Sequence, residues 1–71
     1  MRDVPITTAT IRLGQLLKLA GLVDSGSDAK VVLGDGEVLV NGEVEQRRGR
    51  QLRPGDEVEL AGESVRLVEG T

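Results

Sequence analysis

The sequence predicts an α+β domain with two short N-terminal helices followed by a small antiparallel sheet of about four to five strands. Three observations lead to this prediction. Apolar residues recur at helical spacing in the first half of the chain, apolar and polar residues alternate in the second half, and glycine-containing turns separate these segments. A chain of 71 residues is long enough for one domain, so we expect a single domain over residues 1–71.

The two predicted helices each carry one apolar stripe. The first helix covers residues 13–20, and Gly21 is well placed to end it. Its stripe consists of Leu13, Leu16, Leu17 and Ala20. The second helix begins after Ser25, whose side chain can cap it, and ends at the glycines of residues 34–36. Its apolar face consists of Ala29, Val32 and Leu33.

The predicted sheet is built from short segments with turn signals between them. Asn41-Gly42 is the strongest signal, because both positions of a type I′ hairpin turn favour residues that accept positive φ. Residues 54–56 and 61–63 are predicted to form two further turns. The predicted strands cover residues 37–40, 43–45, 57–60 and 65–68, and residues 6–8 favour a short edge strand.

The residue types that are missing narrow the range of functions. The chain has no Cys and no His, which excludes disulfides, thiolate sites and the nucleophile–imidazole pairs of many enzymes. We therefore expect no enzyme activity, no metal and no cofactor. No apolar run approaches the roughly 20 residues of a membrane span, and no basic-then-apolar leader is visible. We expect a cytoplasmic protein without membrane contacts.

The net charge of −3 is distributed unevenly along the chain. Residues 10–53 hold seven basic and six acidic residues, net +1, whereas residues 54–71 hold one basic and five acidic residues, net −4. The acidity therefore belongs mainly to the C-terminal end, and the rest of the chain is close to neutral.

Short motifs follow one another in a recognisable order along residues 11–60. The chain reads Arg12-Leu13, Leu16-Leu17, Gly21-Leu22-Val23, Ser25, Ala29, Val32, Gly36-Glu37-Val38, Val40-Asn41-Gly42 and Gly55-Asp56-Glu57-Val58. This order resembles the S4-type (alpha-L) RNA-binding domain. The segments Leu13-Gly14-Gln15 and Arg47-Arg48-Gly49-Arg50 resemble the stand-alone bacterial S4-domain proteins of the YbcJ-like group. The resemblance implies an alpha-L fold with its core in residues 11–60, and a non-catalytic, ribosome-associated RNA-binding module.

Two positions at the start of the second helix depart from the family pattern. Gly26 stands where many members carry Arg, and Ser27 stands where the YbcJ-like group often has a second Gly. The resemblance also implies that the two helices supply much of the RNA-binding face.

The densest basic cluster consists of Arg47, Arg48 and Arg50. A loop with these residues can contact phosphates, because each guanidinium offers a planar fork of donors. The alternative is that the arginines form a charged turn by pairing with Glu43 or Glu45.

Further candidate RNA contacts lie on the two helices. Arg12 and Lys18 on the first helix and Lys30 on the second would form a shared basic face, or they are simply exposed to solvent. Ser25 and Gly26 open the second helix, where free N–H groups can hold a phosphate. Their simpler role is to cap the helix.

The chain has no Phe, Trp or Tyr on which a base could stack. We therefore expect a monomer that contacts the phosphates of structured RNA, such as ribosomal or tRNA-like RNA or a ribosomal particle, with marked salt dependence. The alternative is a protein–protein interaction module whose RNA-binding face has decayed, which the acidic C-terminal segment and Gly26 motivate.

Overall fold

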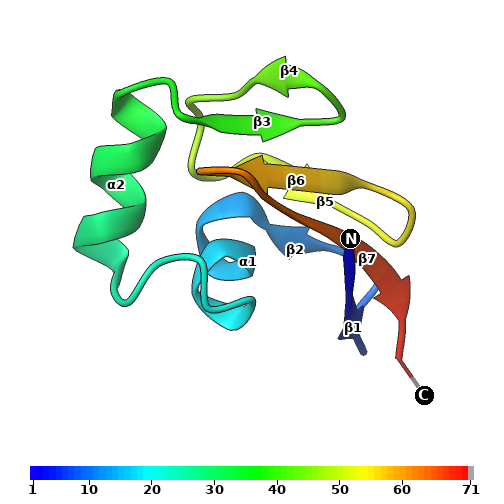
Figure 1. The fold of residues 1–71 in the computed structure, drawn as a ribbon. Coiled ribbons are helices and arrows are strands. Elements are labelled where there is room, and N and C mark those ends of the chain that lie inside the picture. The colour runs from blue at the N-terminus through cyan, green and yellow to red at the C-terminus, as the bar shows by residue number, and fades with distance from the viewer. Residues whose placement is uncertain (71) are drawn as a thin grey trace.

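The computed structural model describes residues 1–70, in which two helices lie together beside a curved mixed sheet (Figure 1). The elements follow in the order β1 (Arg2–Ile6), β2 (Ile11–Arg12), α1 (Leu13–Leu19), α2 (Gly26–Gly34), β3 (Val38–Val40), β4 (Glu43–Val44), β5 (Gln51–Leu52), β6 (Glu57–Leu60) and β7 (Glu63–Glu69). The main sheet has the strand order β1-β7-β6-β3-β4, and β2 and β5 form a separate antiparallel ribbon. Neither helix in residues 1–70 is long and apolar enough to cross a membrane.

The α+β class is confirmed, but two details of the predicted arrangement are wrong. The helices are not N-terminal, because β1 and β2 precede α1. The sheet is not wholly antiparallel, because β1 runs parallel to β7, with Val4 opposite Leu67. A parallel pair needs a long crossover, and here nearly the whole domain lies between the two strands. Local patterns do not report a pairing between opposite ends of a chain, which explains both errors.

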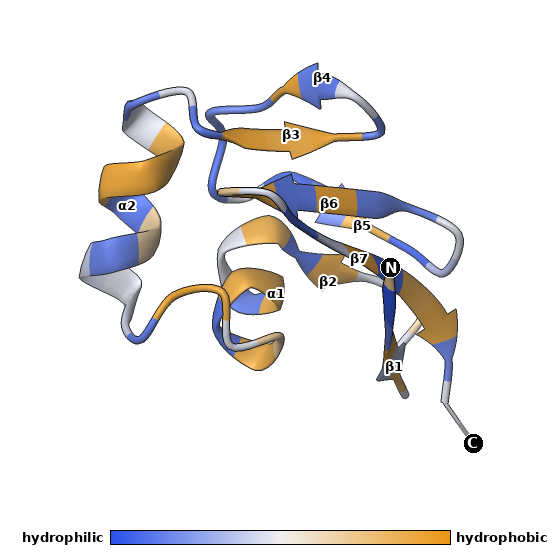
Figure 2. Cartoon of the chain, viewed as in Figure 1, coloured by the Kyte–Doolittle hydropathy of each residue, from blue (hydrophilic) through white to orange (hydrophobic). Residues whose placement is uncertain are grey.

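The apolar stripes predicted for the helices form the centre of the core. Leu13, Leu16 and Leu17 of α1 are fully buried, as is Ala29 of α2. The strands contribute every second residue to the same core, and Figure 2 shows β3 as a continuous apolar strand. Leu52 of the β2–β5 ribbon is also fully buried, so the ribbon is attached to the core by its own side chain. Burial of each of these leucine side chains stabilises the fold by about 1.5–3 kcal/mol.

The ends of the helices follow the capping signals in the sequence. The Ser25 hydroxyl accepts a hydrogen bond from the Asp28 backbone N–H at 3.2 Å, so the predicted cap of α2 is confirmed. After α1 the chain turns at Gly21, which has φ +72°. The Arg2 side chain donates to the carbonyl of Ala20, which joins β1 to the end of α1.

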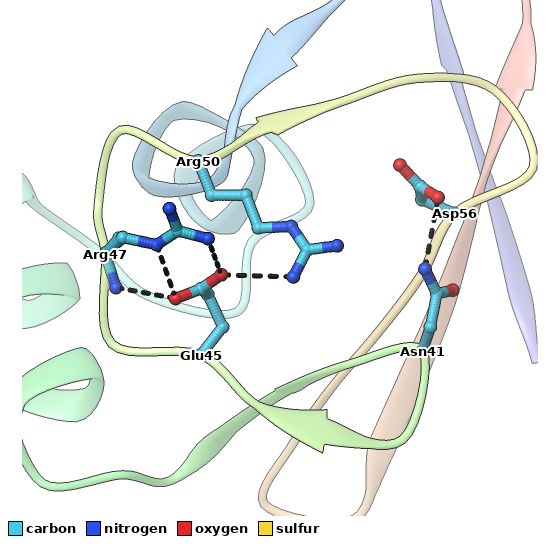
Figure 3. A network of polar contacts seen from close by, with 5 residues as sticks. All are labelled: Asn41, Glu45, Arg47, Arg50 and Asp56. Atoms are coloured by element: carbon cyan, nitrogen blue, oxygen red, sulfur yellow. Dashed lines mark hydrogen bonds and ion pairs between the residues drawn. The ribbon is translucent and has the colours of Figure 1, made fainter.

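The predicted type I′ signal at Asn41-Gly42 is confirmed by φ angles of +51° and +85°. The Asn41 side chain also reaches the turn before β6 (Figure 3), where its Nδ2 donates to Asp56 Oδ1 at 3.1 Å and its Oδ1 accepts from the Glu57 N–H at 2.9 Å. The other Asp56 oxygen accepts from the Arg53 N–H at 3.0 Å. Asn41 and Asp56 therefore connect two turns that are distant in the sequence.

Replacing Asn41 tests this connection. Asn41→Gly keeps the positive φ but loses the side-chain bonds, and it should lower the free energy of unfolding by about 1–2 kcal/mol. Asn41→Ala also adds strain in the left-handed region and should lower it by about 2–4 kcal/mol. Urea unfolding at neutral pH measures both values. An Asn41→Gly variant as stable as the parent would show that the bonds contribute nothing.

Candidate nucleic-acid interface

The arginine loop (residues 46–50) is fastened to both helices. The backbone N–H of Leu13 donates to the Arg50 carbonyl at 2.8 Å, and that of Gly14 donates to the Arg48 carbonyl at 3.0 Å. The first N–H groups of a helix have no partner within the helix, so the loop satisfies donors that α1 would otherwise leave free. Gln46 Nε2 donates to the Gly34 carbonyl at the end of α2, at 3.1 Å. The loop is therefore held at a fixed position between the helices.

Glu45 lies just before the loop and is only 7% exposed. Arg47 binds its carboxylate through two side-chain donors, Nε at 3.2 Å and Nη2 at 3.0 Å, and through its backbone N–H at 3.1 Å (Figure 3). Arg50 Nη1 donates to the same carboxylate at 3.0 Å. These bonds satisfy a carboxylate that would be costly to bury alone.

The same contacts change the acidity of Glu45. The side-chain hydrogen bond from Arg47 is the largest cause, and together with the Arg47 backbone N–H and Arg50 it lowers the pKa of Glu45 from 4.5 to about 2. Burial acts in the opposite direction but is the weaker effect overall. Glu45 in turn raises the pKa of Arg47. Glu45 is therefore ionised throughout the physiological pH range.

The three predicted loop arginines consequently differ in their surroundings. Arg47 and Arg50 both pair with Glu45, as the alternative interpretation of the loop expected. Arg48 is exposed and forms no ion pair within residues 1–70. The Arg47 side chain is still 77% exposed, so pairing does not remove it from the surface.

A hollow of about 420 Å³ lies between the helices and the arginine loop. Its wall includes Lys18 of α1, Gly26 of α2, Arg48 of the loop and Arg12. Arg12 is the last residue of β2 and the N-cap of α1, and so it does not lie on the first helix as predicted. A second hollow is lined by Lys30 and again by Arg48. The remaining residues that line the two hollows are Gly14, Gln15, Ala29, Leu33, Gly34, Gln46 and Gly49. Arg48 therefore stands between the cations of the two helices.

We call the residues Arg12, Lys18, Lys30 and Arg48 the basic face. None of the four forms an ion pair within residues 1–70, and no acidic side chain of that part of the chain lines either hollow. Their charges are therefore available to an anionic ligand. No cluster of three or more metal-ligating side chains occurs among these described residues.

The two remaining predicted residues lie at the start of α2. Gly26 is half-buried and lines the first hollow, whereas Ser25 is exposed and its hydroxyl is engaged in the helix cap. Asp28 places a carboxylate in the first turn of the same helix.

The acidic C-terminal segment forms the β6–β7 hairpin, apart from the basic face. Glu57 and Glu59 alternate with Val58 and Leu60, which are buried, so the two glutamates project from the sheet surface that faces away from the core. On the same surface Arg66 pairs with Asp3 at 3.6 Å. The net charge of −4 in this segment does not fall on the basic face.

Sequence reasoning assigned no role to Gly14, which lies at the second position of α1 and lines the first hollow. A signal was available, because glycine costs about 0.5–1 kcal/mol in a helix relative to alanine and usually marks a close approach there. The role of Glu45 was weighed only as an alternative. The bond between Asn41 and Asp56 had no local signal at all.

Comparison with known proteins assigns this chain to a family. The model of the S4 domain family matches residues 4–68, so the chain belongs to the S4 domain family. The resemblance to the S4-type RNA-binding domain is thereby confirmed.

Particular relatives are closely similar. A Bacillus subtilis (strain 168) protein named "Probable ribosome maturation protein RlbA" is 52% identical over 59 residues, which cover 83% of each chain. An Escherichia coli (strain K12) protein named "Putative RNA-binding protein YbcJ" is 41% identical over 58 residues, covering 82% of this chain and 83% of YbcJ.

Solved structures are similar as well. The solution structure of E. coli YbcJ, described as revealing an "ALFAL motif involved in RNA-binding", matches with a TM-score of 0.68 and 36% identity over 94% of this chain and 84% of that one. The 30S ribosomal protein S4e from Thermoplasma acidophilum matches with a TM-score of 0.64 and 25% identity, covering 84% of this chain and 32% of that one.

The lowered pKa of Glu45 makes a pH-dependent contribution to stability. Because the folded pKa of about 2 lies below the unfolded value of 4.5, this contribution is complete above about pH 4.5 and is lost as the pH falls towards 2. Glu45→Gln should therefore be less stable than the parent at pH 7, and the difference should shrink at pH 3 in urea unfolding. Glu43→Gln removes an exposed carboxylate two residues earlier and is the matched control. A pH-independent difference for Glu45→Gln would contradict the assignment.

Proposed function

We propose that this chain acts as one non-catalytic RNA-binding domain that contacts the phosphates of structured RNA through the basic face. The single observation that carries the proposal is the convergence around adjoining hollows of four cations that form no ion pair within residues 1–70. They come from the N-cap of α1, from α1 itself, from α2 and from the arginine loop. Loops and helix ends that present fixed cations are well suited to phosphates, which need charge and donors but no base-specific pattern.

The relatives support the same class of ligand. The name of YbcJ is "Putative RNA-binding protein", and that of RlbA is "Probable ribosome maturation protein". We extend the proposal accordingly to ribosomal RNA or a ribosomal precursor in the cytoplasm as the natural partner.

The composition favours structured RNA over single strands. Recognition of unpaired bases relies largely on stacking against aromatic rings, and this chain has none. Cations held on a rigid scaffold instead match phosphates whose spacing a folded RNA has already set. Binding of this kind releases counterions and weakens steeply with salt.

We assign the central contact to Arg48, because it borders both hollows. Arg12 and Lys18 extend the contact along α1, and Lys30 extends it along α2. Arg47 and Arg50 would make only peripheral contacts with RNA, because both are bound to Glu45. Ser25 and Gly26 would offer backbone N–H donors at the start of α2.

Removing single charges from the two surfaces tests the proposal. Arg48→Ala should weaken binding to purified ribosomal RNA on the order of tenfold and lower the salt-dependence slope by about 0.7–0.9. Arg66→Ala removes the same charge from the sheet surface and should change affinity by less than about twofold. Fluorescence polarisation at several salt concentrations, with a poly(U) oligonucleotide as the single-stranded comparator, measures both.

Two outcomes would contradict the proposal. Equal losses for Arg48→Ala and Arg66→Ala would mean that binding follows overall charge rather than the basic face. A parent protein that binds no ribosomal RNA at low salt, but retains protein partners after nuclease treatment in a pull-down, would favour a protein-interaction module instead.

A further inference from the structure

Gly14 is buried in the first turn of α1, directly beneath the side chain of Arg48. A Cβ atom at position 14 would lie 2.5 Å from Arg48 Cγ, closer than real Cβ contacts allow, and 3.2 Å from its Cδ, which is tighter than most such contacts. We propose that Gly14 is a positioning residue, whose missing side chain lets the stem of Arg48 cross α1 and carry its charge into the hollow beside Arg12 and Lys18. The RNA part of this inference rests on the proposed function.

The backbone conformation does not explain a glycine at this position. Gly21, Gly36, Gly42, Gly55 and Gly62 have positive φ, but Gly14 does not and is an ordinary helical residue. Alanine would be the better helix former by about 0.5–1 kcal/mol. What distinguishes position 14 is therefore the space that Arg48 occupies.

Arg48 has little freedom to move away as a whole. Its carbonyl accepts the Gly14 N–H at 3.0 Å, and the neighbouring Leu13–Arg50 backbone bond fixes the same loop. The pairing of Glu45 with Arg47 and Arg50 holds the loop on either side of Arg48. A methyl group at position 14 would consequently displace the Arg48 side chain itself, since Cγ is the atom in conflict.

Other helical glycines make the contrast specific. A Cβ atom at Gly34, the last residue of α2, would meet no atom within 4 Å. Gly34 nevertheless lines the second hollow and accepts a hydrogen bond from Gln46 of the arginine loop, so it is not a suitable control for binding. Val31 of α2 is exposed and lines neither hollow, and Val31→Ala is therefore the control for a small change on a helix.

A double-mutant cycle on the full chain tests whether Gly14 acts through Arg48. Gly14→Ala should weaken binding to purified ribosomal RNA nearly as much as Arg48→Ala, on the order of tenfold, and the double variant should bind no worse than Arg48→Ala alone. Val31→Ala should bind like the parent. Additive losses from Gly14→Ala and Arg48→Ala, or parent-like binding by Gly14→Ala, would overturn the proposal.

Urea unfolding of the parent, the two single variants Gly14→Ala and Arg48→Ala, and the double variant tests the steric claim without RNA. In the Arg48→Ala background the conflicting Cγ is absent, so Gly14→Ala should raise the unfolding midpoint through its higher helix propensity. In the Arg48 background that gain should be absent or reversed. Equal shifts in both backgrounds would overturn the steric claim. A parent protein that binds no ribosomal RNA would overturn the proposed function and the RNA role of Gly14, while the unfolding cycle would still decide the contact.

Discussion

Two backbone hydrogen bonds, from Leu13 to the Arg50 carbonyl and from Gly14 to the Arg48 carbonyl, set the position of the arginine loop against α1. They use donors that a helix N-terminus always leaves free, so the loop replaces water or a capping side chain at that end. Arg48 can cross the helix only because the backbones meet this closely at Gly14. The first hollow, and with it the basic face, depends on the same contact.

Unpaired basic side chains and most acidic side chains lie on different surfaces of this molecule. Glu45 neutralises the inner sides of Arg47 and Arg50, and Arg66 pairs with Asp3 on the sheet surface. The basic face is left without acidic partners within residues 1–70, although the whole chain carries a net charge of −3. A net negative charge weakens indiscriminate attraction to nucleic acid. Binding would then require an RNA whose phosphates match the positions of the four cations.

The parts of the fold that follow local rules were predictable from the sequence. The stripe of α1, the Ser25 cap and the Asn41-Gly42 turn each depend on neighbouring residues, and all three occur as predicted. The β1–β7 pair and the β2–β5 ribbon join segments far apart in the chain, so no local pattern reports them. The candidate site was also only partly predictable. The cluster of positive charge indicated the three loop arginines, but only the fold shows that Arg47 and Arg50 bind Glu45 and that Arg48 does not.

Some of the residues that carry the family resemblance lie away from the proposed RNA contacts. Asn41 and Asp56 belong to the two most recognisable motifs, and they bond to each other across the sheet, away from the hollows. They preserve the scaffold. Other motifs of the resemblance, Arg12-Leu13 and Arg47-Arg48-Gly49-Arg50, include two residues of the basic face itself. One fold can serve different ligands, so the ligand must be argued from the site rather than from the scaffold. The scaffold therefore sets the positions of the cations, and the proposed contact with RNA phosphates depends on Arg48 and its neighbours.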